Sequence, residues 1–155
     1  MPTKEFFFLI LFLAIAFACN GQDSITAIDS LLYNSQFDLA INKIDNFLKK
    51  TAHQDSRINL ENKKAEILIR AGKFDEAERL LESIAARQLT ADQQLIRKTN
   101  QGFLFLNQGR NDLAQSTLQE ALARVEKLNK QNTLEAAQLL AYLGNLYLAT
   151  GKYSQ

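Results

Sequence analysis

The side chains that could carry out chemistry in this sequence are few and scattered. His53 is the only histidine, and no cysteine or second histidine stands near it to share a metal ion. Asp75, Glu76 and Glu78 place three carboxylates within one turn, but acidic residues at the start of a helix are favoured by the helix dipole alone. Glycine-rich phosphate loops and Gly-x-Ser-x-Gly motifs are absent. The sequence therefore predicts no enzyme, no cofactor, no metal and no small-molecule substrate.

The composition predicts one helical domain. The chain has 155 residues, a single proline at Pro2, no tryptophan and only six glycines, so little interrupts a helix. Alternating runs of Val, Ile and Thr, which would indicate β-strands, are missing. The formal net charge is +1 and no segment is strongly basic, whereas nucleic-acid binding normally leaves a clustered basic footprint. We therefore expect an all-α protein that does not bind nucleic acid.

Residues 1–19 have the layout of a secretory signal peptide. Phe6 to Phe17 form an unbroken apolar run of twelve residues. As a helix the run spans roughly 18 Å, well short of a hydrocarbon core of about 30 Å. The small residues Ala16 and Ala18 precede a polar stretch, as they do at a cleavage site. A buried N-terminal helix is the alternative, but the run has no polar face. We expect an exported protein.

Cys19 is the only cysteine and stands at the predicted cleavage point, where it has no disulfide partner. The segment before it resembles a bacterial lipobox, with the small residue Ala18 directly before the cysteine. The segment departs from that pattern at Phe17, which is large, and at Ala16, where leucine is usual. Lipidation of Cys19 would give a periplasmic or outer-membrane-associated lipoprotein, which would meet the membrane only through its anchor. Ordinary cleavage would give a periplasmic or secreted protein, and the sequence leaves both open.

The rest of the chain repeats. Equivalent units begin at positions 35, 72, 109 and 151, with spacings of 37, 37 and 42 residues, and each of the last three begins with glycine. Each unit stands between two stretches of helical apolar periodicity. Because four units align on the same residue pattern, a repeat is favoured over an irregular helical bundle. The repeat domain covers residues 24–155, and the sequence given stops inside the fourth unit.

This pattern resembles the tetratricopeptide repeat family. The residues that carry the resemblance are Gly72, Phe74, Ala77, Gly102, Phe105, Gly109, Ala114, Ala121, Gly144, Tyr147, Gly151 and Tyr153. The resemblance implies a right-handed α-solenoid of antiparallel helix pairs, with about three and a half repeats. The family's tryptophan and terminal proline are missing, and the spacing exceeds the usual 34 residues. These departures affect the subfamily and the superhelical pitch, not the fold.

Helix positions follow from the periodicity and from the capping residues. Thr90 and Gln93 have the spacing of a capping box, and Ser24, Ser56 and Thr133 are suitable N-caps for the other first helices. The first helices of the pairs are expected at 25–34, 57–71, 91–108 and 134–150. The second helices are expected at 37–50, 74–87 and 112–129.

The glycines have two expected roles. Gly72, Gly109 and Gly151 follow first helices, where a left-handed residue closes the last carbonyl groups. Gly102 and Gly144 lie within helices at a cost of ~1 kcal/mol each relative to alanine, which is tolerable where another helix approaches closely. The alanines of the second helices offer matching small surfaces.

The resemblance also implies a concave groove, lined by the first helices, that binds a protein or peptide partner. The repeat positions give Asn62, Glu66, Arg70, Thr99, Phe103, Asn107, Gln138 and Asn145 as groove candidates. The other lining positions that they give are Asn59, Ile69, Ile96, Leu106, Ala141, Leu148 and Ala149. This mixture of amides and apolar residues suits an extended peptide better than an anion. Ordinary exposure or packing between repeats is the alternative for each residue.

Two functions remain open. The first is a protein-binding scaffold, exported and tethered to a membrane through Cys19 if that residue is lipidated. The second is the sensory or docking region of a longer signalling protein, with a histidine kinase or caspase-like peptidase effector after the repeats. The sequence identifies neither the partner nor the oligomeric state.

Overall fold

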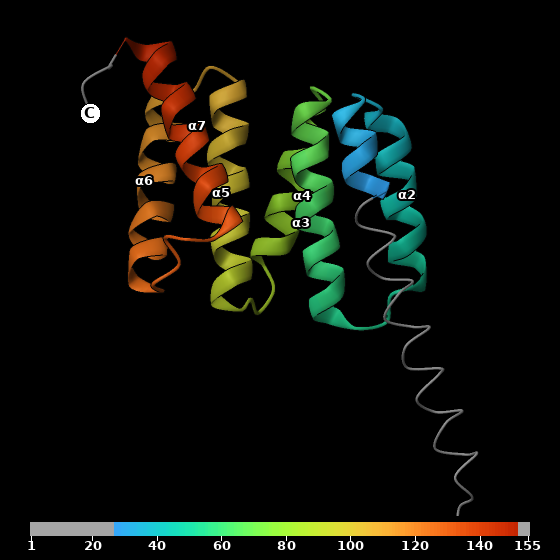
Figure 1. Ribbon diagram of the computed structural model, residues 1–155. Helices are drawn as coiled ribbons and strands as arrows, with labels where there is room; N and C mark the ends of the chain where they lie inside the picture. Colours follow the sequence, from blue (N-terminus) through green and yellow to red (C-terminus); the bar gives the residue numbers. More distant parts are fainter. Residues whose placement is uncertain (1–26, 152–155) are drawn as a thin grey trace, which may run out of the picture.

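The computed structural model describes residues 27–151 and shows helix pairs stacked side by side (Figure 1). The predictions for the signal peptide, Cys19, Ser24 and Tyr153 lie outside these residues. Residues 27–33 are helical, and the helices that follow are α2 (Phe37–Lys50), α3 (Gln54–Arg70), α4 (Phe74–Ala85), α5 (Ala91–Asn107), α6 (Asn111–Lys127) and α7 (Leu134–Thr150). Residues 27–151 contain no strand, which confirms the all-α helical repeat solenoid. Within the same residues, no helix is long and apolar enough to cross a membrane.

Two of the three described N-cap predictions are confirmed. Thr90 Oγ1 accepts a hydrogen bond from the Gln93 backbone at 3.2 Å, and Gln93 Oε1 accepts one from the Thr90 backbone at 3.1 Å. These reciprocal bonds satisfy two orphan amides and start α5. Thr133 Oγ1 accepts from the Ala136 backbone at 3.3 Å and starts α7 in the same way.

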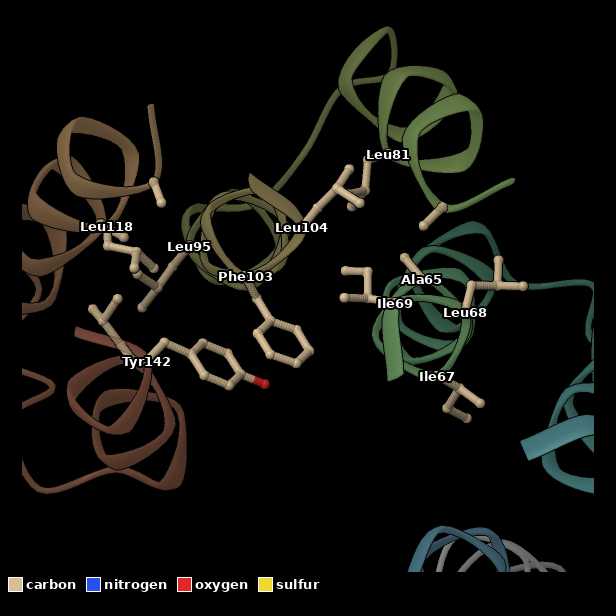
Figure 2. Packing of buried hydrophobic residues seen from close by; sticks show 14 of the residues in the cluster. Ala65, Ile67, Leu68, Ile69, Leu81, Leu95, Phe103, Leu104, Leu118 and Tyr142 are labelled. Atoms are coloured by element: carbon tan, nitrogen blue, oxygen red, sulfur yellow. The ribbon is translucent and has the colours of Figure 1, made fainter. Parts of the chain in front are cut away.

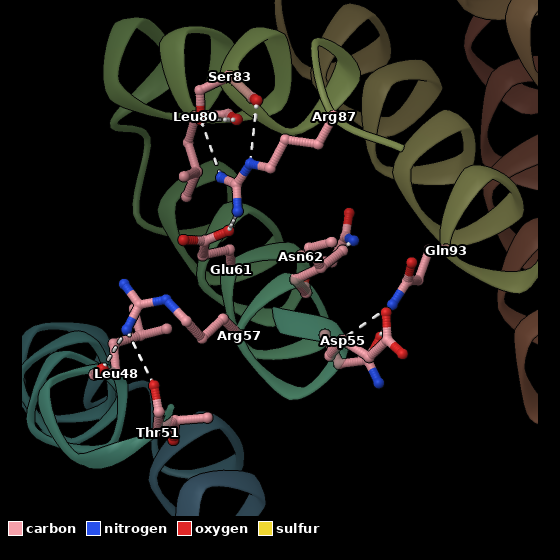
Figure 3. A network of polar contacts seen from close by, with 12 residues as sticks. Leu48, Thr51, Asp55, Arg57, Glu61, Asn62, Leu80, Ser83, Arg87 and Gln93 are labelled. Carbon is pink, nitrogen blue, oxygen red and sulfur yellow. Dashed lines mark hydrogen bonds and ion pairs between the residues drawn. The ribbon is translucent and has the colours of Figure 1, made fainter. Parts of the chain in front are cut away.

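The third N-cap prediction, Ser56, is wrong. Helix α3 already begins at Gln54 with His53 as N-cap, so Ser56 lies in its first turn. The Arg57 backbone donates to the His53 carbonyl at 3.0 Å. The Arg57 guanidinium donates to the Leu48 carbonyl at 2.6 Å and to the Thr51 carbonyl at 3.1 Å (Figure 3). These bonds join the first turn of α3 to the end of α2, which explains why the helix starts earlier than the cap pattern indicates.

Left-handed residues end the first helices, as predicted. Gly72, Gly109 and Gly151 have φ values of 74°, 72° and 72°. After α3, the Lys73 backbone donates to the Leu68 carbonyl at 2.9 Å and Gly72 donates to the Ile69 carbonyl at 3.0 Å, a pair of bonds that closes the helix end. Ser35 occupies the same position of the first unit with φ 55° and lacks the glycine that tolerates this conformation.

The helices form two rows. Helices α3, α5 and α7 contact one another in order, and α4 and α6 lie on the other side of α5 (Figure 2). Fully buried aliphatic side chains from both rows belong to one hydrophobic cluster: Ile44, Ile67, Leu68, Ile69, Leu95, Leu104, Leu118, Val125, Leu139 and Leu146. Each contributes roughly 1.5–3 kcal/mol when removed from water. This shared core holds the first helices in a fixed row.

Gly102 and Gly144 differ, although they occupy equivalent repeat positions. A Cβ atom added at Gly102 would lie 2.5 Å from Leu118 Cδ2 and 2.6 Å from Leu118 Cγ, so α6 packs directly on this glycine as predicted. A Cβ at Gly144 would meet nothing within 4 Å, so the predicted close approach there is wrong. The reason is that Gly102 is covered by the helix after its own, and no described helix follows α7.

Ion pairs connect neighbouring repeats. Lys73, in the turn after α3, contacts Asp38 of α2 at 2.7 Å, and Arg110 in the next equivalent turn contacts Glu78 of α4 at 3.7 Å. Both pairs are exposed, so solvent screens them and neither contributes much to stability. Their recurrence at equivalent turns marks the same stacking geometry in successive repeats.

Candidate functional site

An aromatic stack stands between α5 and α7 on the row of first helices. The Phe103 and Tyr142 rings are nearly parallel, at 6° to one another, with centroids 4.1 Å apart (Figure 2). The Arg70 guanidinium from α3 lies 5.6 Å from the centre of the Phe103 ring. Three successive first helices are thus connected through one cation and two rings, an arrangement stabilised by the charge distribution of the rings.

Glu66 is the charged centre beside this stack. Its side chain is mostly buried and accepts from Arg70 Nη2 at 2.9 Å and from Lys63 Nζ at 3.2 Å. Burial disfavours the charge on Arg70, but Glu66 and Tyr142 more than offset this and hold the pKa of Arg70 above its ordinary value. Burial, and then the Glu66 carboxylate, raise the pKa of the Tyr142 hydroxyl, which accepts a hydrogen bond from Gln138 Nε2 at 2.7 Å. The phenol is therefore neutral at physiological pH.

A cavity of about 190 Å³ opens next to these residues, between α3, α5 and α7. It is lined by Asn59, Asn62, Lys63, Glu66, Ile96, Thr99, Asn100, Leu134, Glu135 and Gln138. Two of the lining residues have a buried side-chain atom without a hydrogen-bond partner, Asn62 Oδ1 and Thr99 Oγ1. The Asn62 side chain donates to the Ile58 carbonyl at 3.1 Å, and Asn100 donates to the Asn62 carbonyl at 2.8 Å. These bonds fix the position of Asn62, while its Oδ1 atom remains without a donor.

A second hollow, of about 320 Å³, adjoins the first and shares Asn59, Ile96 and Glu135 with it. Here Gln93 Nε2 of α5 donates to the Asp55 carbonyl and to Asn59 Oδ1, each at 3.3 Å, which ties the starts of α5 and α3 together (Figure 3). Beyond them, Lys130 contacts Asp92 at 2.6 Å. The two hollows form one elongated depression, which we call the groove.

The structure brings together half of the predicted groove residues. Asn62, Glu66, Thr99 and Gln138 line the first hollow of the groove, with Asn62 and Thr99 almost fully buried at its floor. The other four predicted residues, Arg70, Phe103, Asn107 and Asn145, do not line either hollow. Arg70 and Phe103 belong to the adjacent stack, Asn107 donates to the Phe103 carbonyl at 2.8 Å, and Asn145 is exposed on α7.

Several residues at this site were not predicted: Lys63, Asn100, Leu134, Glu135 and Tyr142. Repeat spacing makes Asn145, not Tyr142, the equivalent of Phe103, because position 103 plus the 42-residue step is 145. The available signal for Tyr142 was its helical spacing of four from Gln138, which puts both on one face of α7. Leu134 could have been noticed as a large apolar residue at a helix start. Among residues 27–151, no group of three or more His, Cys, Asp or Glu side chains could hold a metal ion.

Stacked helix pairs with recurring left-handed ends, and an open face along their first helices, define a helical repeat solenoid of the interaction-scaffold class. The tetratricopeptide repeat family model matches residues 99–155, the part that contains the Gly102 and Gly144 pattern. This match supports a tetratricopeptide repeat protein, as the sequence pattern predicts. No curated protein matches the chain in sequence. Repeats of this family generally mediate protein–protein interactions and are typically non-catalytic.

Proposed function

We propose that the groove on α3, α5 and α7 binds an extended peptide segment of a partner protein. The observation that carries this proposal is that two residues lining an open cavity, Asn62 and Thr99, each have a buried side-chain oxygen without a hydrogen-bond partner. Buried polar atoms without a partner are costly, and a bound group that supplies the missing hydrogen bonds removes that cost. An extended peptide offers backbone N–H and C=O groups at regular intervals for this purpose.

The rim of the groove supplies the apolar part of the contact. Leu134 lines the first hollow and is 81% exposed, so it presents apolar surface at the rim. Ile96 lies on the opposite helix and lines both hollows. A peptide whose backbone meets Asn62 and Thr99 can therefore place an apolar side chain between Leu134 and Ile96.

The proposal is tested by selecting binders from a random peptide display library against the whole chain. The affinity of an enriched peptide is then measured for the chain and for two variants. Leu134→Glu should weaken binding about tenfold or more, because it replaces apolar rim surface with a carboxylate next to Glu135. Leu39→Glu is the matched control, since Leu39 is also exposed, at 56%, but lies on α2 outside the groove.

Equal loss of affinity in both variants would show that the peptides respond to net charge. Unchanged affinity in Leu134→Glu would show that they bind elsewhere on the chain. Either result removes the groove from the proposal, while the repeat fold itself would stand. Circular dichroism of each variant checks that the exposed substitutions leave the helices intact.

We also propose that the chain is exported, on the basis of the apolar run at 6–17 and the small residues before Cys19. Lipidation at Cys19 would tether the scaffold to a membrane, and stable tethering takes more than one acyl chain. Mass spectrometry of the mature N-terminus separates the two routes. A diacylated or triacylated Cys19 supports the lipoprotein, an unmodified new terminus supports ordinary cleavage, and an intact Met1 contradicts export.

The alternative proposal is that these repeats are the docking region of a longer signalling protein with a kinase or peptidase effector. The exposed face of α7 favours it, since Leu140 and Leu148 are 52% and 62% exposed on either side of the open space at Gly144. A further helix or domain would cover this surface. A genomic reading frame that continues beyond residue 155 into an effector supports the alternative, and an immediate stop codon contradicts it.

A further inference from the structure

A cluster of cations lines a cavity that is separate from the groove. The cavity measures about 150 Å³ and lies between the end of α4, the middle of α5 and α6. Its lining consists of Ala85, Arg87, Leu89, Gln94, Arg97, Lys98 and Arg124. Four of these seven side chains are positively charged and none is negatively charged, so the cavity concentrates positive potential.

Two of the four cations already have a carboxylate partner. Arg87 contacts the mostly buried Glu61 at 2.6 Å (Figure 3), and Lys98 contacts Glu120 of α6. Both carboxylates lie outside the lining. The charges of Arg87 and Lys98 are thereby largely compensated within the fold.

The other two cations, Arg97 and Arg124, have only neutral partners. Arg97 Nη1 donates to Gln101 at 3.3 Å, and Arg124 Nη1 donates to Gln94 at 2.8 Å. Among residues 27–151, neither guanidinium forms an ion pair with a carboxylate, although Arg97 also lines a smaller cavity together with Glu78 and Glu82. In addition, Arg97 Nε is buried and has no hydrogen-bond partner. The cavity thus has two uncompensated charges and one unused donor.

The cations also disfavour one another's charge. Burial, and then repulsion by Arg124, hold the pKa of Arg97 below its ordinary value. Lys98 is paired with the exposed Glu120, yet burial, Arg124 and Arg97 together place its pKa below the ordinary value as well. Like charges that are held together without a counter-ion destabilise the fold, and a bound anion would remove this repulsion.

We propose that this cavity binds a doubly charged tetrahedral oxyanion, a phosphate or phosphate monoester, between Arg97 and Arg124. A phosphate monoester carries about −1.5 to −2 charges at neutral pH, which matches the two uncompensated guanidinium groups. Guanidinium groups bind phosphate oxygens through paired N–H donors, and Arg97 Nε supplies a donor that the fold leaves unused. A water molecule takes about 30 Å³ of liquid, so a cavity of about 150 Å³ admits such a group.

The test follows thermal unfolding of the whole chain in sodium phosphate and in sodium chloride of equal ionic strength. Phosphate should raise the melting temperature above the value in chloride, because an anion that binds only the folded state stabilises it. Arg124→Gln should abolish this phosphate-specific rise. In chloride alone the same variant should unfold at an equal or higher temperature, since it relieves repulsion and Arg124 is exposed.

Arg79→Gln is the matched control, because Arg79 is an exposed arginine of α4 that does not line the cavity. The control removes the same charge and should keep the full phosphate effect. In calorimetric titrations with inorganic phosphate, Arg124→Gln and Arg97→Gln should each bind phosphate about tenfold or more weakly than the unmodified chain. A phosphate effect of equal size in Arg124→Gln and Arg79→Gln would be a bulk salt effect and would overturn the proposal.

A second arm identifies the source of the oxyanion. Flotation with phosphatidylcholine vesicles that contain phosphatidic acid, compared with phosphatidylcholine alone, tests a lipid headgroup. Vesicle binding that Arg124→Gln abolishes, without an effect of inorganic phosphate, assigns the site to a headgroup. A phosphate effect without vesicle binding assigns it to a soluble phosphate. The absence of both overturns the proposal and leaves the peptide-binding proposal unaffected, since the two sites share no lining residue.

Discussion

Substituting Gly102 and Gly144 by alanine should change stability in opposite directions. Both glycines lie inside helices at equivalent repeat positions, so composition and repeat pattern do not distinguish them. The structure does, because a new Cβ at position 102 would collide with Leu118 and one at position 144 would meet open space. The pair therefore isolates the contribution of helix packing from that of helix propensity.

The expected magnitudes follow from two terms. Alanine is better than glycine within a helix by ~1 kcal/mol, and both variants gain this term. At Gly102 the gain is offset by overpacking of about 1–3 kcal/mol, since Leu118 is fully buried and a Cβ would lie 2.5 Å from its Cδ2 atom. We therefore expect Gly144→Ala to stabilise the fold by about 1 kcal/mol and Gly102→Ala to destabilise it by about 1 kcal/mol.

Urea denaturation followed by circular dichroism measures both changes. A double-mutant cycle with Leu118→Ala gives the control, because truncation of Leu118 removes the atoms that the new Cβ would meet. In the Leu118→Ala background, Gly102→Ala should become stabilising, by about 1 kcal/mol. Stabilisation of the same size by Gly102→Ala in both backgrounds would refute the close contact between α5 and α6.

Three further predictions concern single positions. Ser35→Gly should stabilise the fold by roughly 0.5–1 kcal/mol in urea denaturation, because it relieves the left-handed φ of 55°; destabilisation would contradict that conformation. Thr90→Ala should cost about 1 kcal/mol through loss of the capping box, and an unchanged midpoint would contradict the cap. Tyr142 has a raised pKa, so its stability contribution is present below pH ~10 and is lost as the pH rises through the folded-state value. Tyr142→Phe should therefore flatten the alkaline decline in a denaturation series across pH, and an unaltered decline would contradict this burial.

The positions of the helices could be predicted from sequence because local signals agree. Thr90 and Thr133 mark helix starts, Gly72 and Gly109 mark helix ends, and the observed bounds lie within three residues of the predicted ones. The α3 start was missed because it depends on Arg57, whose guanidinium bonds belong to the junction with α2 and leave no pattern in the sequence.

The site was harder to predict because it depends on how one helix faces another. Repeat arithmetic makes position 145 the equivalent of Phe103, whereas the ring that stacks on Phe103 is Tyr142, almost one helical turn earlier. Gly144 was expected to be covered for the same reason, since the repeat pattern gives its position but not its neighbour. The cationic cavity was also missed, because Arg97 and Arg124 are far apart in the chain and only the packing of α5 against α6 brings them together.

Peptide binding to the face of α3, α5 and α7 is tested most directly by an NMR map of the surface that a selected peptide contacts. Amide and methyl shifts of the chain are followed during titration with a peptide from the display selection. If the groove binds the peptide, the largest changes should occur at Ile96, Thr99, Leu134 and Gln138, with little change at Leu39 and Leu113 on the other row of helices. Changes concentrated on α2, α4 and α6, with the groove residues unaffected, would contradict the claim that the face of α3, α5 and α7 binds the partner.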